Sequence, residues 1–251
     1  NEPGAAVNLE TVRGIQPDDH VLGNPNAPII FYVYSDFSCE HCKAYHKTMR
    51  LLTQAYGGDG NMAWVFRHMP YIQLHPEAPM YALATECVAE ELGDYGFWAY
   101  ADMLFEKGDP LKPFSAGELV GMASSIGADK QSFVTCMSTN ELMAEVEKDF
   151  EEGMAAGAQG TPFTIVETPA KRDVYQGAQP YRVLALALQN AVRSFGSPTD
   201  SSSVEQEYMN DFDAILEDTK ATTSSSTGSI LDGIVGDLCS RSASIISLSA
   251  H

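Results

Sequence analysis

The sequence contains no long hydrophobic run. Its longest apolar stretch, Ala27 to Tyr34, is far short of the roughly 20 residues that a membrane-spanning helix needs. No basic-then-apolar signal segment opens the chain. With 44% apolar and 10% aromatic residues among 251, however, the chain has enough apolar material for a sizeable core. We therefore expect a soluble globular protein that is already processed.

Basic residues are scarce. The chain has 15 Lys and Arg against 34 Asp and Glu, which gives a formal net charge of -19. Binding to a nucleic-acid backbone needs a basic face. This composition therefore excludes nucleic acid as an expected partner, and we expect the acidity to serve solubility.

Cysteine is also sparse, but its spacing is informative. Five cysteines are too few for a miniprotein built on disulfides. Cys39 and Cys42 form one close pair, Cys87 and Cys136 stand apart from each other, and Cys239 lies near the C-terminus. The close pair is the strongest chemical signal in the sequence.

The sequence around this pair predicts a strand followed by a helix. Residues 29 to 35 form a continuous β-branched and aromatic run, typical of a strand buried on both faces. Apolar positions at helical spacing then follow Cys42 and stop at Gly57. A second strand is predicted from Met62 to Met69, before Pro70. This order indicates a parallel strand-helix-strand crossover.

The rest of the chain divides by pattern into four parts. We expect an N-terminal arm over 1–17, an α/β domain over 18–75 and 159–196, an inserted helical domain over 76–158, and a tail over 197–251. Within the second half of the α/β domain, strands are predicted at Phe163–Glu167 and Arg172–Gln176, before a last helix. The tail holds 18 Ser or Thr among 55 residues and is expected to be flexible.

A thiol at a helix N-terminus meets unpaired backbone N–H groups and the positive end of the helix dipole, both of which favour the thiolate. Cys39 is therefore expected to be the nucleophile. Cys42, inside the helix, is expected to resolve a mixed disulfide by attacking Cys39. His41 between them can add a donor or a positive charge near Cys39, which would make the disulfide more oxidising.

Other readings of these residues remain open. Cys39, His41, Cys42 and His46 could be metal ligands, but a closed zinc site usually needs a second Cys or His pair, and none is evident. A purely structural Cys39–Cys42 disulfide would restrain only a very short loop. The histidines at positions 46, 68 and 75 are expected to be ordinary surface or loop residues.

Several motifs together resemble the DsbA-like thioredoxin family. They are the run Asp19–Pro28, the buried strand with Ser35–Cys42, the helical insertion, and Gly160–Phe163, and they cover roughly residues 18 to 195. The resemblance implies a thioredoxin fold of the α/β class, with a helical insertion between the second and third core strands. It also implies a cis bond between Thr161 and Pro162 that lies against the active-site disulfide and offers the Thr161 backbone to an extended peptide. From the dipeptide alone, only about one X-Pro bond in twenty is cis.

The resemblance further implies an extracytoplasmic protein that introduces disulfides into reduced exported proteins. A membrane protein like DsbB or VKOR would reoxidise it, and the chemistry calls for no cofactor. Cys87 and Cys136 are expected to form a structural disulfide, because related sequences often place cysteines at these two points; two free buried cysteines are the alternative. A disulfide reductase or isomerase, and a redox-inactive peptide-binding module, remain alternative functions.

The sequence departs from the family pattern at one position. Many members keep a buried acid six residues before the first cysteine, where it accepts the proton of the second cysteine, and this chain has Val33. We expect proton transfer to run through water, or through Asp36 or Glu40 instead. A carboxylate at Glu40 would also disfavour the Cys39 thiolate.

Overall fold

The computed structural model describes residues 8–109 and 111–195. A five-stranded mixed sheet in the order β1-β3-β2-β4-β5 lies at its centre. The strands are β1 (His20–Gly23), β2 (Ile29–Ser35), β3 (Met62–His68), β4 (Phe163–Glu167) and β5 (Arg172–Gln176). Between β2 and β3, which are parallel, runs α1 (Glu40–Tyr56). The parallel pair and the observed bounds agree closely with the sequence-based prediction.

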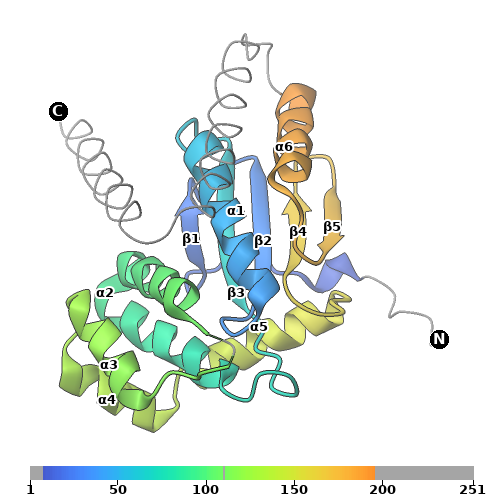
Figure 1. Cartoon of the computed structure of the whole chain (residues 1–251). Helices are drawn as coiled ribbons and strands as arrows, with labels where there is room; N and C mark the ends of the chain where they lie inside the picture. The colour runs from blue at the N-terminus through green and yellow to red at the C-terminus, as the bar shows by residue number, and fades with distance from the viewer. Residues whose placement is uncertain (1–7, 110, 196–251) are drawn as a thin grey trace, which may run out of the picture. The chain divides into compact units, whose positions relative to one another are not determined.

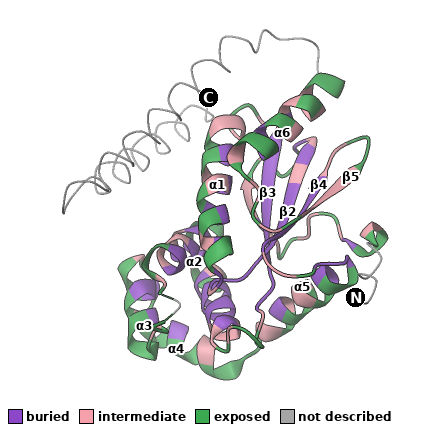
Figure 2. Cartoon of the chain, turned by 45° about the vertical axis from the view of Figure 1, so that its right-hand side comes forward, coloured by how far each residue is buried: buried purple, intermediate pink, exposed green. Residues whose placement is uncertain are grey.

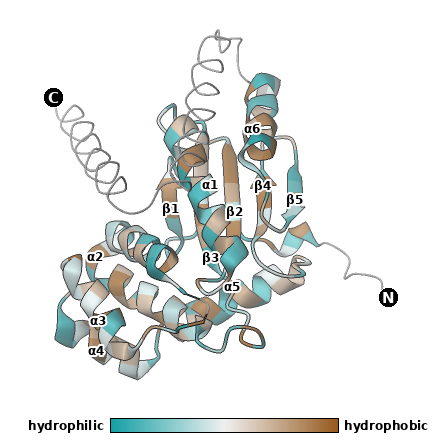
Figure 3. Cartoon of the chain, viewed as in Figure 1, coloured by the Kyte–Doolittle hydropathy of each residue, from teal (hydrophilic) through white to brown (hydrophobic). Residues whose placement is uncertain are grey.

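The central strand β2 is buried on both faces, as its apolar run predicts (Figure 2). On one face Phe31 and Val33 pack in a cluster with α1, α2 and α6 (Tyr181–Phe195). On the other face Tyr32 and Tyr34 pack with Val12 and with the segment after α5 (Met143–Ala155). Figure 3 shows β2 and β4 as hydrophobic and the edge strand β5 as hydrophilic. Successive side chains of β2 point to opposite faces of the sheet and so pack in two separate cores.

Four helices separate β3 from β4, so the predicted insertion is confirmed (Figure 1). They are α2 (Ala78–Lys107), α3 (Ala116–Ser125), α4 (Lys130–Thr139) and α5. Gly93 interrupts α2 with φ 63°, a left-handed conformation that favours glycine. At the start of α3, Ser115 and Glu118 form a reciprocal capping box. Local sequence signals thus define both the kink in α2 and the beginning of α3.

The strand β1 was not predicted. It pairs antiparallel with β3 at the edge of the sheet, from His20 opposite Phe66 to Gly23 opposite Ala63. The strand has only four residues and is mostly half-buried, so it lacks the continuous apolar run that marks β2. The segment before it also packs on the domain: Val12 is buried, and Arg13 forms ion pairs with Asp149 and Glu152 of α5.

Some expectations lie outside the described residues. The tail from 197 onward, with Cys239, is among them, as is the start of the N-terminal arm. Among residues 8–109 and 111–195, no helix has the length and apolar character needed to cross a membrane. Across the same part of the chain, no group of three or more His, Cys, Asp or Glu residues is placed to hold a metal ion.

Candidate active site

The two cysteines of the close pair lie where β2 leads into α1. Cys39 is the N-cap residue of α1, with φ -84° and ψ 120°, and its N–H donates to the carbonyl of Asp36 at 3.1 Å. Cys42 lies in the first turn of the helix. Both are free thiols, and 8% of Cys39 but none of Cys42 is exposed. An incoming sulfur atom can therefore reach Cys39 and not Cys42.

The surroundings of Cys39 favour its thiolate. A hydrogen bond from the Cys42 thiol is the largest of the effects that lower the pKa of Cys39 from its ordinary value of 9.0 to about 5. Burial opposes this shift, while the Thr161 side chain and the backbone N–H groups of Cys42 and His41 add to it. The N–H donors are the unpaired groups that every helix start leaves open. Near neutral pH, Cys39 is therefore largely a thiolate.

The surroundings of Cys42 have the opposite effect. Burial is the main cause that raises the pKa of Cys42, and the hydrogen bond and negative charge of Cys39 raise it further. The Ser35 side chain and the N–H of Asp36, which donates to the sulfur at 3.4 Å, partly offset this rise. The Cys42 sulfur thus stays protonated when Cys39 has lost its proton.

The loop before β4 lies against Cys39. The peptide bond between Thr161 and Pro162 is cis, as the family resemblance implies. The Cys39 sulfur lies 3.6 Å from the Thr161 carbonyl oxygen, to which it donates only in its protonated form, although 122 residues separate the two in sequence. Because β4 pairs antiparallel with β2, the ends of the two strands bring these residues together. The backbone of Thr161 therefore borders the reactive sulfur.

The sequence predicted a donor or a positive charge from His41 near Cys39, and the structure shows a donor, the backbone N–H of His41. Its side chain is exposed, whereas its N–H group is one of the donors that lower the pKa of Cys39. Glu40 is exposed beside it.

Val33 occupies the position of the missing buried acid, and 1% of it is exposed. Asp36, which we considered as a substitute, is also buried, but its carboxylate serves another purpose. It accepts hydrogen bonds from the N–H groups of Ser38 and Tyr71 and from Nδ1 of His75, each at 2.8 Å. The carboxylate therefore connects the active-site turn to the loop that precedes α2. The hydrogen bond from Asp36 to Cys42 comes from the Asp36 backbone N–H.

The expectation that the histidines at positions 46, 68 and 75 are surface or loop residues holds for His75, which lies in the loop before α2, and is wrong for His46 and His68. His46 and His68 are buried, and each contacts an acid of α2 at 2.6 Å: His46 meets Asp102 and His68 meets Glu86. The half-buried His75 contacts Asp36. A single histidine in a sequence does not reveal these partners, because the carboxylates come from distant parts of the chain.

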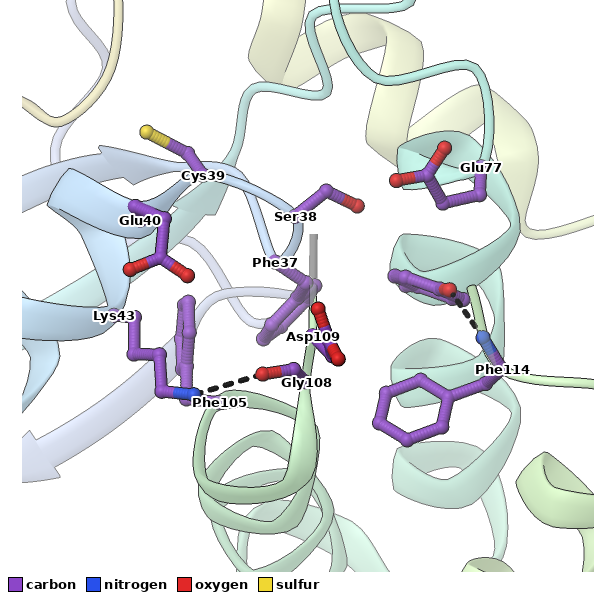
Figure 4. A pocket seen from close by; sticks show the side chains of 11 residues that line it. Phe37, Ser38, Cys39, Glu40, Lys43, Glu77, Phe105, Gly108, Asp109 and Phe114 are labelled. Atoms are coloured by element: carbon purple, nitrogen blue, oxygen red, sulfur yellow. Dashed lines mark hydrogen bonds between the residues drawn. The ribbon is translucent and has the colours of Figure 1, made fainter. Parts of the chain in front are cut away.

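A pocket borders Cys39 on the side of the inserted helices (Figure 4). The turn before α1 contributes Phe37 and Ser38 to it, and α2 and the segments that flank it contribute Glu77, Phe105 and Asp109, among others. Sequence reasoning identified none of these five residues as part of the site. The run Ser35–Cys42 contains two of them, but no local signal joins α2 to the active site.

The inserted helices are cross-linked away from the reactive pair. A disulfide joins Cys87 of α2 to Cys136 of α4, with 5.7 Å between the Cα atoms. This is the pairing that the family resemblance implies.

A family model described as thioredoxin matches residues 16–174. The Na(+)/H(+) antiporter NhaA of Herminiimonas arsenicoxydans is 29% identical over 166 residues, which are 66% of this chain and 25% of that protein. The antiporter NhaA 3 of Salinispora tropica is 30% identical over 159 residues, 63% of this chain and 23% of that protein. The chain thus spans about a quarter of the length of these curated relatives.

Solved structures are similar across most of the described chain. The thiol-disulfide exchange protein α-DsbA2 of Wolbachia pipientis has a TM-score of 0.59 and 22% identity, covering 69% of this chain and 87% of its own. Oxidised BdbD of Bacillus subtilis has a TM-score of 0.62 and 20% identity, and the match covers 76% of this chain and 97% of BdbD. At these identities the structures establish the fold. Because the family model spans both thiols and the Thr161–Pro162 bond, the chain belongs to the thioredoxin family, and its fold is that of the DsbA-like thiol-disulfide oxidoreductases.

Proposed function

We propose that this protein is a thiol-disulfide oxidoreductase that donates the Cys39–Cys42 disulfide to reduced exported proteins. One observation carries the proposal: Cys39 lies at the N-cap of α1 beside the fully buried Cys42, an arrangement that lowers the pKa of Cys39 to about 5 and raises that of Cys42. Only the reduced form contains a thiolate. Whatever stabilises the Cys39 thiolate therefore stabilises the reduced form and makes the disulfide a stronger oxidant.

The exchange takes two steps. A substrate thiolate attacks Sγ of Cys39, the bond between Cys39 and Cys42 breaks, and Cys42 leaves and takes up a proton. A second substrate thiolate then attacks the substrate sulfur of the mixed disulfide, and Cys39 leaves as a thiolate. Two electrons pass from the substrate dithiol to the protein. A leaving thiol of low pKa departs faster, so the shifted pKa of Cys39 favours release of the oxidised substrate.

The loop at Thr161 and Pro162 is the proposed substrate contact. The Thr161 carbonyl lies 3.6 Å from the Cys39 sulfur, so an extended peptide whose cysteine reaches Cys39 would lie along this backbone. Hydrogen bonds to main-chain groups do not depend on the side chains of the peptide, so a contact of this kind tolerates many substrate sequences, as the addition of a peptide to a strand edge does. Such a contact suits a protein that acts on many unfolded substrates.

An oxidising compartment outside the cytoplasm is the proposed location. The Cys87–Cys136 disulfide supports it, because structural disulfides persist where thiols are not kept reduced. Each turnover leaves Cys39 and Cys42 reduced, so a reoxidant must accept two electrons from them. A membrane protein like DsbB or VKOR is the proposed reoxidant, in keeping with the family resemblance. Ion transport, which the names of the longer antiporter relatives indicate, is no part of the proposal.

Disulfide transfer to a reduced, unfolded protein with two cysteines tests this function. The oxidised protein should remove two substrate thiols for each protein disulfide consumed. When the substrate is supplied as its mixed disulfide with glutathione, reduced Cys42→Ser should release glutathione and accumulate a Cys39–substrate mixed disulfide, because the resolving thiol is gone, whereas Cys39→Ser should form none. Transfer that survives Cys39→Ser would refute the assigned roles. A reductase or isomerase would leave the substrate thiols unpaired at equilibrium. A redox-inactive module would form no mixed disulfide with the substrate.

A further inference from the structure

The pocket beside Cys39 carries an unbalanced negative charge. Three of its lining residues are acids: Glu40, Glu77 and Asp109. Within residues 8–109 and 111–195, none of these carboxylates forms an ion pair. Lys43, the one cation among the lining residues, forms no ion pair with these acids and offsets only one of the three negative charges. Its Nζ donates to the carbonyls of Gly108 at 2.8 Å and Glu106 at 3.4 Å, as Figure 4 shows for Gly108.

The nearest basic residue after the pocket does not neutralise it either. Lys112 follows Asp109 closely in sequence, but its Nζ lies 3.9 Å from Glu118 of α3. Asp109 instead accepts a hydrogen bond from the N–H of Leu111 at 2.9 Å, which leaves its charge unpaired. A cation from outside the chain would find all three pocket carboxylates available.

The wall of the pocket is aromatic. The rings of Phe37 and Phe105 lie 5.0 Å apart, and those of Tyr81 and Phe114 lie 5.5 Å apart. Aromatic faces attract Lys and Arg heads, and the aliphatic stems of these residues pack well on apolar surfaces. The aromatic rings can therefore pack against the aliphatic stem of a Lys or Arg side chain, while the carboxylates attract its charged head.

Ser38 adds a polar group inside this wall. Its hydroxyl oxygen is buried and has no hydrogen-bond partner within the described chain. Figure 4 shows this hydroxyl directed into the pocket, between Cys39 and Glu77. A buried hydroxyl without a partner is costly, so a bound N–H donor would satisfy it.

We propose that this pocket selects substrate segments that carry Lys or Arg close to the reacting cysteine. The inference rests on the disulfide-donor function proposed above and adds a substrate preference to it. Cys39 itself lines the pocket, so the cysteine of a bound substrate lies at its edge. Since an extended chain advances about 3.3 Å per residue, a basic residue one to three positions from that cysteine can reach the carboxylates. Acidic segments are repelled at the same place.

The experiment compares dithiol peptides that differ only at the positions beside the first cysteine. These positions, before or after the cysteine, hold Lys, Ser or Glu. Rates of peptide oxidation are measured for the full-length oxidised protein and for Glu77→Gln/Asp109→Asn. Glu40 is left intact, because it lies between the two cysteines. The matched control, Glu147→Gln/Glu151→Gln, removes two exposed carboxylates of α5 for which the structure shows no hydrogen bond or ion pair.

The Lys peptides should react about five times faster than the Glu peptides with the wild type, since an exposed ion pair changes an equilibrium by only a few fold. The ratio should approach one in Glu77→Gln/Asp109→Asn and in high salt, and should persist in the control. Equal wild-type rates for all peptides would overturn the preference while leaving the donor function intact. An equal loss in the control would also overturn it, because the overall charge would then be the cause. Failure to oxidise any peptide would refute the donor function itself.

Discussion

The hydrogen bond from Cys42 to Cys39 makes the sharpest prediction, because it is the largest cause of the low pKa of Cys39. Cys42→Ala removes the donor, and Cys42→Ser keeps a hydroxyl in its place. A hydrogen bond to a charged group contributes about 1.5–3 kcal/mol. One pKa unit corresponds to about 1.4 kcal/mol. The Ala variant should therefore raise the Cys39 pKa by about one to two units, to between about 6 and 7. The Ser variant should raise it less.

Thiolate absorbance near the ultraviolet edge, followed against pH in the reduced protein, measures this pKa directly. Alkylation rates alone would mislead, because a thiolate becomes more nucleophilic as its pKa rises. Circular dichroism of each variant controls for folding, since Cys42 is fully buried. An unchanged midpoint in Cys42→Ala would refute the reasoning. The N–H groups at the start of α1 would then be the dominant cause.

Four further predictions concern stability and proton transfer. The folded state lowers the Cys39 pKa from 9.0 to about 5, so the stability that it gives is present above pH 9 and is lost as pH falls through 5. Denaturant titrations should therefore show that the free energy of unfolding of the reduced protein rises relative to that of the oxidised protein as pH increases from 5 to 9. Glu86 lies 2.9 Å from His20, whose pKa the carboxylates of Asp94 and Glu86 raise to about 9 although burial opposes the shift, so Glu86→Gln breaks a buried ion pair and should lower the free energy of unfolding by about 3 kcal/mol; calorimetry checks this. Cys87→Ala/Cys136→Ala opens a loop of 49 residues and should cost about 4 kcal/mol in the same measurement. Val33→Glu buries a carboxylate, so it should lower stability but speed a proton-limited step at neutral pH; coincident stopped-flow profiles from pH 5 to 9 would contradict it.

Local sequence determined much of the fold. The run at 29–35 predicted β2 to the residue, since a short run of β-branched and aromatic residues is typical of a strand buried on both faces. The pair at Cys39 and Cys42 identified where the helix begins and which of the two thiols is more exposed. The short edge strand β1 escaped prediction, because its residues do not alternate clearly and its partner β3 lies far along the chain.

The candidate site was less predictable, because its groups meet only through the tertiary structure. Thr161 reaches Cys39 because β4 pairs with β2, and the cis bond that follows it was implied by family resemblance and not by the dipeptide. Two histidines were misread for the same reason, since the acids that hold His46 and His68 belong to α2. Two of the three pocket acids, Glu77 and Asp109, lie just before and just after α2, which no local motif connects to the cysteines.

The redox potential of the Cys39–Cys42 pair, measured at pH 7 against mixtures of reduced and oxidised glutathione, tests the central claim most directly. Stabilisation of the Cys39 thiolate makes the disulfide oxidising, so the account predicts a potential less negative than about -200 mV, in the range of disulfide donors. A potential near about -270 mV, as in thioredoxin, would mark a reductant and contradict the account.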